Sequence, residues 1–133
     1  MTQPLTHRRK LRVLIADDIQ ETRRNTRLML ATIDDVEVVA IAANGIQAVQ
    51  LAKEHHPDIV LLDINMPEMD GLEFVKAVRQ DARYSGLVVM MVTTETEPDQ
   101  MLRALTAGAD EYLMKPFAKD GLVDKLRLVG MVK

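Results

Sequence analysis

The sequence predicts an α/β fold, a doubly wound three-layer sandwich built from five strand–helix units, (βα)5. Short runs of branched apolar residues alternate with longer segments of helical spacing, five of each, from Leu11 to Val129. Such alternation is typical of parallel strands joined by right-handed helical crossovers. One run, Ile59–Leu62, is apolar throughout and follows the helix-stopping Pro57. It indicates a central strand that is covered on both faces of the sheet.

The first half of the chain contains three predicted strands and two predicted helices. The strands are expected at Leu11–Ala16, Val36–Ile41 and Ile59–Leu62, and the helices at about Ile19–Ala31 and Ile46–His56. The first helical segment is free of Gly and Pro, and it should leave Arg23, Arg24 and Arg27 in solvent. Asn44-Gly45 is expected to form the turn before the second helix.

The second half continues the same alternation. A helix after Gly71 should make its inward contacts through two pairs, Leu72 with Val75 and Phe74 with Val78. The remaining elements are expected at Leu87–Val92 (strand), from Thr96–Asp99 to Gly108 (helix), at Glu111–Met114 (strand) and at Ala118–Val129 (helix). The fourth helix should begin near Thr96, because a hydroxyl residue there precedes a proline and an acid.

Length and composition indicate a single domain and exclude several functions. With 133 residues, 47% hydrophobic and 28% charged, the chain suits one core, and we expect a polar tail at residues 1–10, one domain at residues 11–133 and no effector domain. The absence of Cys excludes disulfides and thiolate metal sites. A net charge of −3 argues against direct nucleic-acid binding. No apolar run approaches the roughly 20 residues of a membrane span, so we expect a cytoplasmic protein without membrane contact.

Polar residues stand at the ends of four predicted strands. Asp17-Asp18, Asp63, Thr93 and Lys115 follow the first, third, fourth and fifth strands, respectively. The carboxyl ends of parallel strands meet at one edge of the sheet, where ligands of such sheets bind. We therefore expect these side chains to converge.

Three clustered carboxylates repel one another and need a cation. At an effective dielectric of about 20, each pair about 4 Å apart costs on the order of 4 kcal/mol. An all-oxygen set without His or Cys suits a hard cation, and Mg²⁺ fits best because it retains waters and pairs with phosphate. With Lys115 as a second cation and Thr93 as a hydroxyl donor, the set describes a phosphoryl-transfer site in which Asp63 attacks phosphorus.

This ordered set resembles the receiver domain of two-component response regulators, and the resemblance extends from Leu11 to Met131. The matching motifs are Asp63-Ile64-Asn65-Met66-Pro67-Glu68-Met69-Asp70-Gly71-Leu72, Met91-Val92-Thr93, Tyr112, Lys115-Pro116-Phe117, Lys125 and Val129-Gly130-Met131. Within the family they are most similar to chemotaxis regulators of the CheY type. The resemblance implies a flavodoxin-like parallel sheet in strand order 2-1-3-4-5 and a cis Lys115-Pro116 peptide bond.

The resemblance also implies a role for each site residue. Asp63 would be the phosphoacceptor, and Lys115 would neutralise charge on the phosphoryl oxygens. Mg²⁺ would be held by Asp18, Asp63 and the backbone carbonyl of Asn65, with Asp17 acting through water. The chain would thus be a phosphoacceptor signalling protein and not an enzyme with a turnover substrate.

A switch and a set of partners follow from the same resemblance. The hydroxyl of Thr93 would move toward the phosphoryl group, and the ring of Tyr112 would turn into the vacated space, which biases a two-state element. The expected partners are a histidine kinase of the CheA type, an output protein such as a flagellar motor switch component, and a phosphatase.

Three alternatives to a chemotaxis receiver remain open from the sequence. A phosphatase of the haloacid-dehalogenase class would need a second aspartate two residues after the nucleophile, where this chain has Asn65. A flavodoxin-like cofactor binder would need a phosphate loop after the first strand, in place of Asp17-Asp18. A phosphorelay intermediate outside chemotaxis is the third, because Thr94 and Pro98 depart from the usual CheY pattern.

Overall fold

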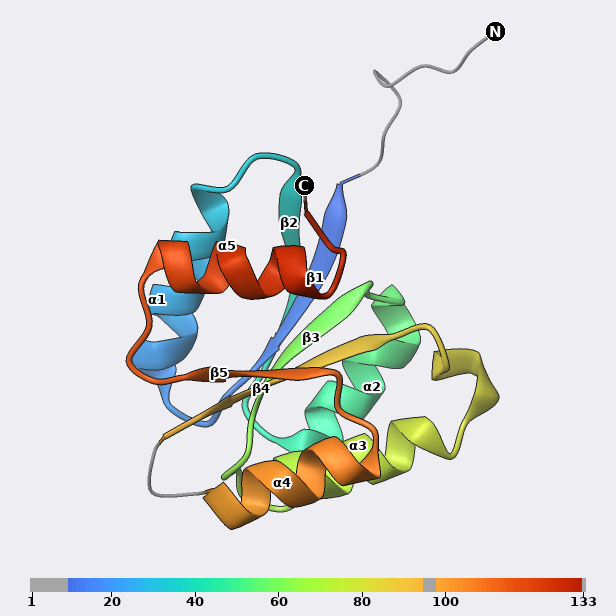
Figure 1. Cartoon of the computed structure of the whole chain (residues 1–133). Coiled ribbons are helices and arrows are strands. Elements are labelled where there is room, and N and C mark those ends of the chain that lie inside the picture. The colour runs from blue at the N-terminus through green and yellow to red at the C-terminus, as the bar shows by residue number, and fades with distance from the viewer. Residues whose placement is uncertain (1–9, 95–97, 133) are drawn as a thin grey trace, which may run out of the picture.

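The computed structural model describes residues 10–94 and 98–132 (Figure 1). These residues form a five-stranded sheet in the order β2-β1-β3-β4-β5, in which all neighbouring strands are parallel. Helices alternate with the strands along the chain. The predicted doubly wound α/β fold and its 2-1-3-4-5 strand order are confirmed.

The elements lie within a few residues of their predicted positions. The strands are β1 (Leu11–Ala16), β2 (Val36–Ala42), β3 (Ile59–Asp63), β4 (Val88–Thr93) and β5 (Glu111–Met114). The helices are α1 (Gln20–Ala31), α2 (Gly45–His55), α3 (Gly71–Arg79), α4 (Pro98–Ala107) and α5 (Lys119–Leu128), with a short 3-10 helix, η2 (Ala82–Tyr84), that the sequence did not predict. The expected cap of α4 at Thr96 lies outside the described residues, as does the tail at residues 1–9.

The sheet separates two hydrophobic clusters, which makes three layers (Figure 1). On one face, alternate strand residues pack against α1 and α5; this cluster includes Val13, Ile15, Leu61, Met90, Leu30, Leu122 and Leu126. On the other face the intervening residues pack against α2, α3 and α4; this cluster includes Leu14, Val60, Leu62, Met91, Ala52, Phe74 and Ala104. Every residue of β3 is buried, so the prediction of a central strand is confirmed.

Two glycines hold the chain close to the end of β3. The amide of Gly45 donates to the carbonyl of Met69 at 2.9 Å, and a Cβ at Gly45 would lie 2.3 Å from that oxygen. The amide of Gly71 donates to Ile64, and a Cβ there would lie 2.5 Å from the carbonyl oxygen of Asp63. Both positions therefore require glycine, and together they fix the loop that follows Asp63.

Side-chain caps start the two helices that flank this loop. Asn44 accepts a hydrogen bond from the amide of Gln47, so the predicted Asn44-Gly45 turn is the N-cap of α2. Asp70 and Glu73 form a reciprocal capping box at the start of α3. No helix within residues 10–94 and 98–132 is both long enough and apolar enough to cross a membrane.

Candidate functional site

The site lies at the carboxyl edge of the sheet, where the predicted residues meet. Asp63 and Thr93 are the last residues of β3 and β4, Asp17-Asp18 follows β1 and Lys115 follows β5. Carboxylate oxygens of Asp17, Asp18 and Asp63 all lie within 4.8 Å of one another. The strand topology places these side chains together although they come from distant parts of the chain.

Lys115 partly compensates the charge of this cluster. Its Nζ lies 3.3 Å from Oδ2 of Asp17 and 3.4 Å from Oδ1 of Asp63. Asp17 and Asp63 are buried, whereas Asp18 is exposed. With all groups ionised, three carboxylates and one ammonium leave two negative charges in an all-oxygen cluster. This donor set fits a hard divalent cation such as Mg²⁺.

The Asp63 carboxyl group is strongly perturbed by its surroundings. Its pKa is raised from 3.8 to about 7: burial is the largest cause and raises it, the charge of Lys115 lowers it, and the charge of Asp17 raises it. Hydrogen bonds from Lys115 and from the backbone of Asn65 favour the ionised form but do not offset burial. With a pKa of about 7, the Asp63 carboxyl group is partly protonated at neutral pH, and a cation bound beside it would favour the ionised form. Such a perturbed pKa is typical of a functional carboxyl group.

Asp17 is anchored by more contacts than its sequence position suggests. Its backbone amide donates to Ala42 of β2 at 3.1 Å, and its Oδ1 accepts from the amide of Ile19 at 2.9 Å. Its carbonyl oxygen accepts from Nη1 of Arg23 at 2.7 Å. Arg23 is therefore half-buried against the site, and the prediction that it points into solvent is wrong. Helical periodicity carries no signal for this contact, because it depends on how the β1–α1 loop bends.

Thr93 and Tyr112 occupy neighbouring strands. Thr93 is 1% exposed, its hydroxyl donates to the carbonyl of Thr94 at 3.3 Å, and its own carbonyl accepts from the amide of Lys115 at 2.6 Å. Tyr112 pairs with Met91, two residues before Thr93, and its ring is half-buried. Tyr112 therefore lies in β5, three residues before Lys115 and further from the carboxyl edge of the sheet than Thr93.

An ion pair holds the outer side of the Tyr112 ring. Nζ of Lys125 lies 4.5 Å from the ring centroid and 3.3 Å from Oε1 of Glu111. The same oxygen accepts from the amide of Tyr112. No sequence pattern singles out Glu111, because its contact with Lys125 depends on the packing of α5 against the edge strand β5. The predicted cis Lys115-Pro116 bond is confirmed.

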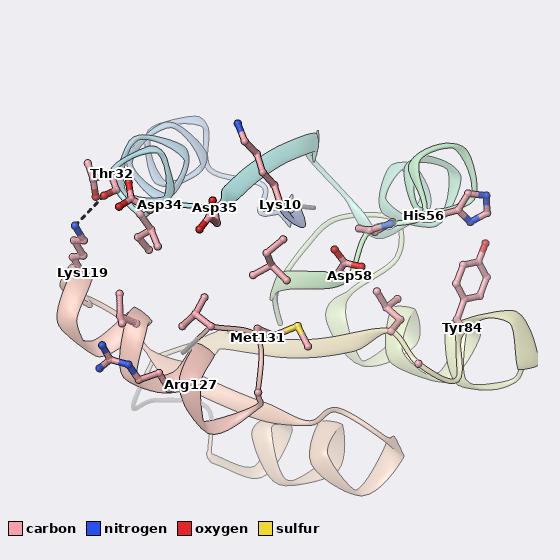
Figure 2. Close-up of a pocket in the computed structure, with 18 of the residues that line it drawn as sticks. Lys10, Thr32, Asp34, Asp35, His56, Asp58, Tyr84, Lys119, Arg127 and Met131 are labelled. Atoms are coloured by element: carbon pink, nitrogen blue, oxygen red, sulfur yellow. Dashed lines mark hydrogen bonds between the residues drawn. The ribbon is translucent and has the colours of Figure 1, made fainter. Parts of the chain in front are cut away.

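Two hollows border different ends of the sheet. The smaller, about 360 Å³, borders Lys115 and is lined by one side of α1, from Thr22 to Met29, and by Thr94, Pro116 and Phe117. The larger, about 910 Å³, lies at the amino ends of the strands, and its lining includes the basic residues Lys10 and Arg127 as well as the acids Asp34, Asp35 and Asp58 (Figure 2). Its described lining includes none of the predicted site residues and mixes both signs of charge, so we assign the chemistry to the carboxyl edge.

Comparison with known proteins agrees with this geometry. A family model for the response regulator receiver domain matches residues 13–127. The chain is 36% identical to the uncharacterized transcriptional regulatory protein YhcZ of Bacillus subtilis over 120 residues, which are 90% of this chain and 55% of that protein. It spans about half the length of a second transcriptional relative and about a third of two protein-glutamate methylesterase relatives.

Relatives of similar length also match. The chain is 38% identical to the chemotaxis protein CheY of Bacillus subtilis over 116 residues, 86% of this chain and 93% of that protein. The solved structure of the chemotaxis response regulator CheY4 of Vibrio cholerae superposes with a TM-score of 0.81 at 36% identity, and the match covers 90% of this chain and 98% of that one. The edge-of-sheet cluster, the fold and these matches lead to one conclusion: the chain belongs to the response regulator receiver domain family.

Proposed function

We propose that this protein receives a phosphoryl group on Asp63 from a histidine kinase or from a small phosphodonor such as acetyl phosphate. The observation that carries the proposal is the buried Asp63 carboxyl group, 3.4 Å from the Lys115 ammonium and grouped with two further acids. A carboxylate oxygen of Asp63 forms a bond to phosphorus, and the bond from phosphorus to the donor atom breaks. The donor leaves with the electron pair, and Asp63 carries an acyl phosphate.

The same residues suit Mg²⁺. Asp18, Asp63 and the backbone carbonyl of Asn65 would hold the ion, with Asp17 acting through water; the all-oxygen cluster with its excess of negative charge supports this assignment. When bound, the ion supplies positive charge to the phosphoryl oxygens. Lys115, which directly follows the edge strand β5, supplies a second positive charge, and its contacts with Asp17 and Asp63 keep the ammonium within reach of the reaction.

Thr93 and Tyr112 would transmit the signal. Phosphorylation adds about −1.5 to −2 charges and three acceptor oxygens. Thr93 is the last residue of β4, which pairs with β3, and Asp63 is the last residue of β3. If Thr93 turns from the Thr94 carbonyl toward these oxygens, space opens behind it for the Tyr112 ring. The surface formed by Tyr112 and Lys125 then changes, and a partner protein reads the change.

For partners we propose a histidine kinase of the CheA type, an output protein in chemotaxis such as a flagellar motor switch component, and a phosphatase. The match to CheY over most of both chains supports the chemotaxis assignment. The protein would act in the cytoplasm through protein contacts, without direct binding to nucleic acid or membrane. The haloacid-dehalogenase alternative is not favoured, because the family match is to receiver domains and Asn65 stands at the position of its general acid.

Phosphate transfer is tested with acetyl phosphate. Incubation of the protein with acetyl phosphate and Mg²⁺ should add one phosphoryl mass that is labile to base and to hydroxylamine, as an acyl phosphate is. Asp63→Asn keeps the side-chain shape and removes the nucleophile, and Asp58→Asn is a matched aspartate control outside the acid cluster. Undiminished labelling of Asp63→Asn would refute the assignment, whereas loss in both variants would indicate a general defect.

The output is tested with beryllofluoride, which mimics the phosphoryl group. A pull-down with the wild-type protein, with and without beryllofluoride and Mg²⁺, should capture a partner only in the activated sample. A motor or chemotaxis protein in that sample supports the chemotaxis output. Capture of a transcription component instead would indicate that the protein acts in a phosphorelay outside chemotaxis.

A further inference from the structure

Arg23 connects α1 to the acid cluster. It is the fourth residue of α1, and its Nη1 reaches back six residues to donate to the carbonyl oxygen of Asp17 at 2.7 Å. The first turn of a helix is the positive end of the helix dipole and disfavours cations. The contact with the Asp17 carbonyl gives the guanidinium a partner at this otherwise unfavourable position.

Three hydrogen bonds restrain the start of α1. Its N-cap residue, Ile19, makes no side-chain cap hydrogen bond. The turn is held by the amide of Ile19 on Oδ1 of Asp17, by the amide of Arg23 on the carbonyl of Ile19, and by the Arg23 guanidinium on the carbonyl of Asp17. These three bonds tie the β1–α1 loop to the first turn of the helix.

The bond to the Asp17 carbonyl also restrains the backbone at the start of Asp18. The carbonyl oxygen and the amide of the next residue belong to one rigid peptide plane, so a bond that holds the Asp17 carbonyl also limits rotation at the start of Asp18. Asp17 is buried and contacts Lys115, whereas Asp18 is exposed. Asp18 therefore depends more than Asp17 on its backbone for orientation toward the cluster.

We infer that Arg23 is a positioning residue that keeps the Asp18 carboxylate directed at a divalent cation shared with Asp63. The inference rests on the proposed function, and it adds a residue that supports a ligand through the main chain. Residues that orient metal ligands typically contribute about 10–100-fold to metal affinity. Lysine at this position would keep the charge but would lack the planar, multiply donating guanidinium.

The test is a Mg²⁺ titration followed by backbone amide NMR in the full chain. Arg23→Met should raise the Mg²⁺ dissociation constant by about tenfold or more, and Arg23→Lys should fall between Arg23→Met and the wild type. Arg24→Met is the matched control, because Arg24 is an exposed neighbour on the same helix and its replacement removes the same charge; its dissociation constant should change less than about twofold. Equal weakening by Arg23→Met and Arg24→Met, or no weakening by Arg23→Met, would overturn the inference.

A second measurement uses the metal-free protein. Because the Ile19 amide is bonded to Asp17, its hydrogen exchange in EDTA should be faster in Arg23→Met and unchanged in Arg24→Met. Unchanged exchange in both variants would contradict the positioning role. If the wild type itself shows no response to Mg²⁺, the proposed metal function fails, and the exchange rates alone decide the role of Arg23. Each variant is also checked by thermal melting. If Arg23→Met does not fold, Arg23→Lys and Arg23→Gln replace it: a higher Mg²⁺ dissociation constant than in wild type supports the positioning role, and an unchanged one overturns it.

Discussion

The raised pKa of Asp63 makes the stability of the metal-free protein depend on pH in a predictable direction. A carboxyl group whose pKa is higher in the folded state binds its proton more tightly there. Its contribution to stability is complete below the unfolded value near 3.8 and is lost as the pH rises through about 7. The free energy of unfolding of the wild-type protein should therefore fall between about pH 5 and about pH 8, and Asp63→Asn should not show the part of this fall that comes from Asp63.

The size of the effect follows from the pKa difference. One pKa unit corresponds to about 1.4 kcal/mol, so a rise from 3.8 to about 7 sets an upper limit of about 4 kcal/mol over the whole titration, of which about 3 kcal/mol falls between about pH 5 and about pH 8. The cluster opens to solvent at the exposed Asp18, and screening there should reduce the effect to about 2 kcal/mol. For a urea m-value of about 2 kcal/mol/M, the urea midpoint of Asp63→Asn relative to wild type should therefore be about 1 M higher at about pH 8 than at about pH 5.

Urea unfolding followed by circular dichroism in EDTA measures this difference. Wild type, Asp63→Asn and Asp34→Asn are compared at both pH values, with exposed Asp34 as the control for loss of one negative charge. A midpoint difference between Asp63→Asn and wild type that does not change with pH would refute the reasoning. An equal change in Asp34→Asn would assign the effect to net charge and not to the buried site.

Three further predictions concern the metal, the switch and the core. Asp18→Ala should abolish the NMR response to Mg²⁺, and an unchanged affinity would place the ion elsewhere. Thr93→Ala should still accept phosphate at Asp63 but should lose about tenfold to a hundredfold in beryllofluoride-dependent partner binding, because a hydrogen bond to a charged group contributes about 1.5–3 kcal/mol. Equal responses to beryllofluoride in wild type and Thr93→Ala would contradict the switch. Phe74→Ala, at a fully buried position, should lower the free energy of unfolding by about 3–5 kcal/mol in urea, and a loss below about 1 kcal/mol would contradict its core role.

The order of elements and the site residues at the strand ends could be predicted from local patterns. An apolar run such as Ile59–Leu62 becomes a central strand because it can be buried on both faces. Once the strands are parallel, their carboxyl ends must share an edge, so Asp17, Asp63 and Lys115 converge without any detail of side-chain packing. That is why residues as far apart in the sequence as Asp17 and Lys115 could be assigned to one cluster.

The tertiary structure alone decided what surrounds those residues. Helical periodicity places Arg23 in solvent, but the bend after β1 brings the Asp17 carbonyl within its reach. Likewise, Glu111 joins Lys125 and Tyr112 only because α5 crosses the edge strand. The pKa of Asp63 depends on burial and on the distances to Lys115 and Asp17. Sequence patterns record which side chains share an element, whereas these contacts depend on loop paths and on the packing of one element against another, which no local pattern contains.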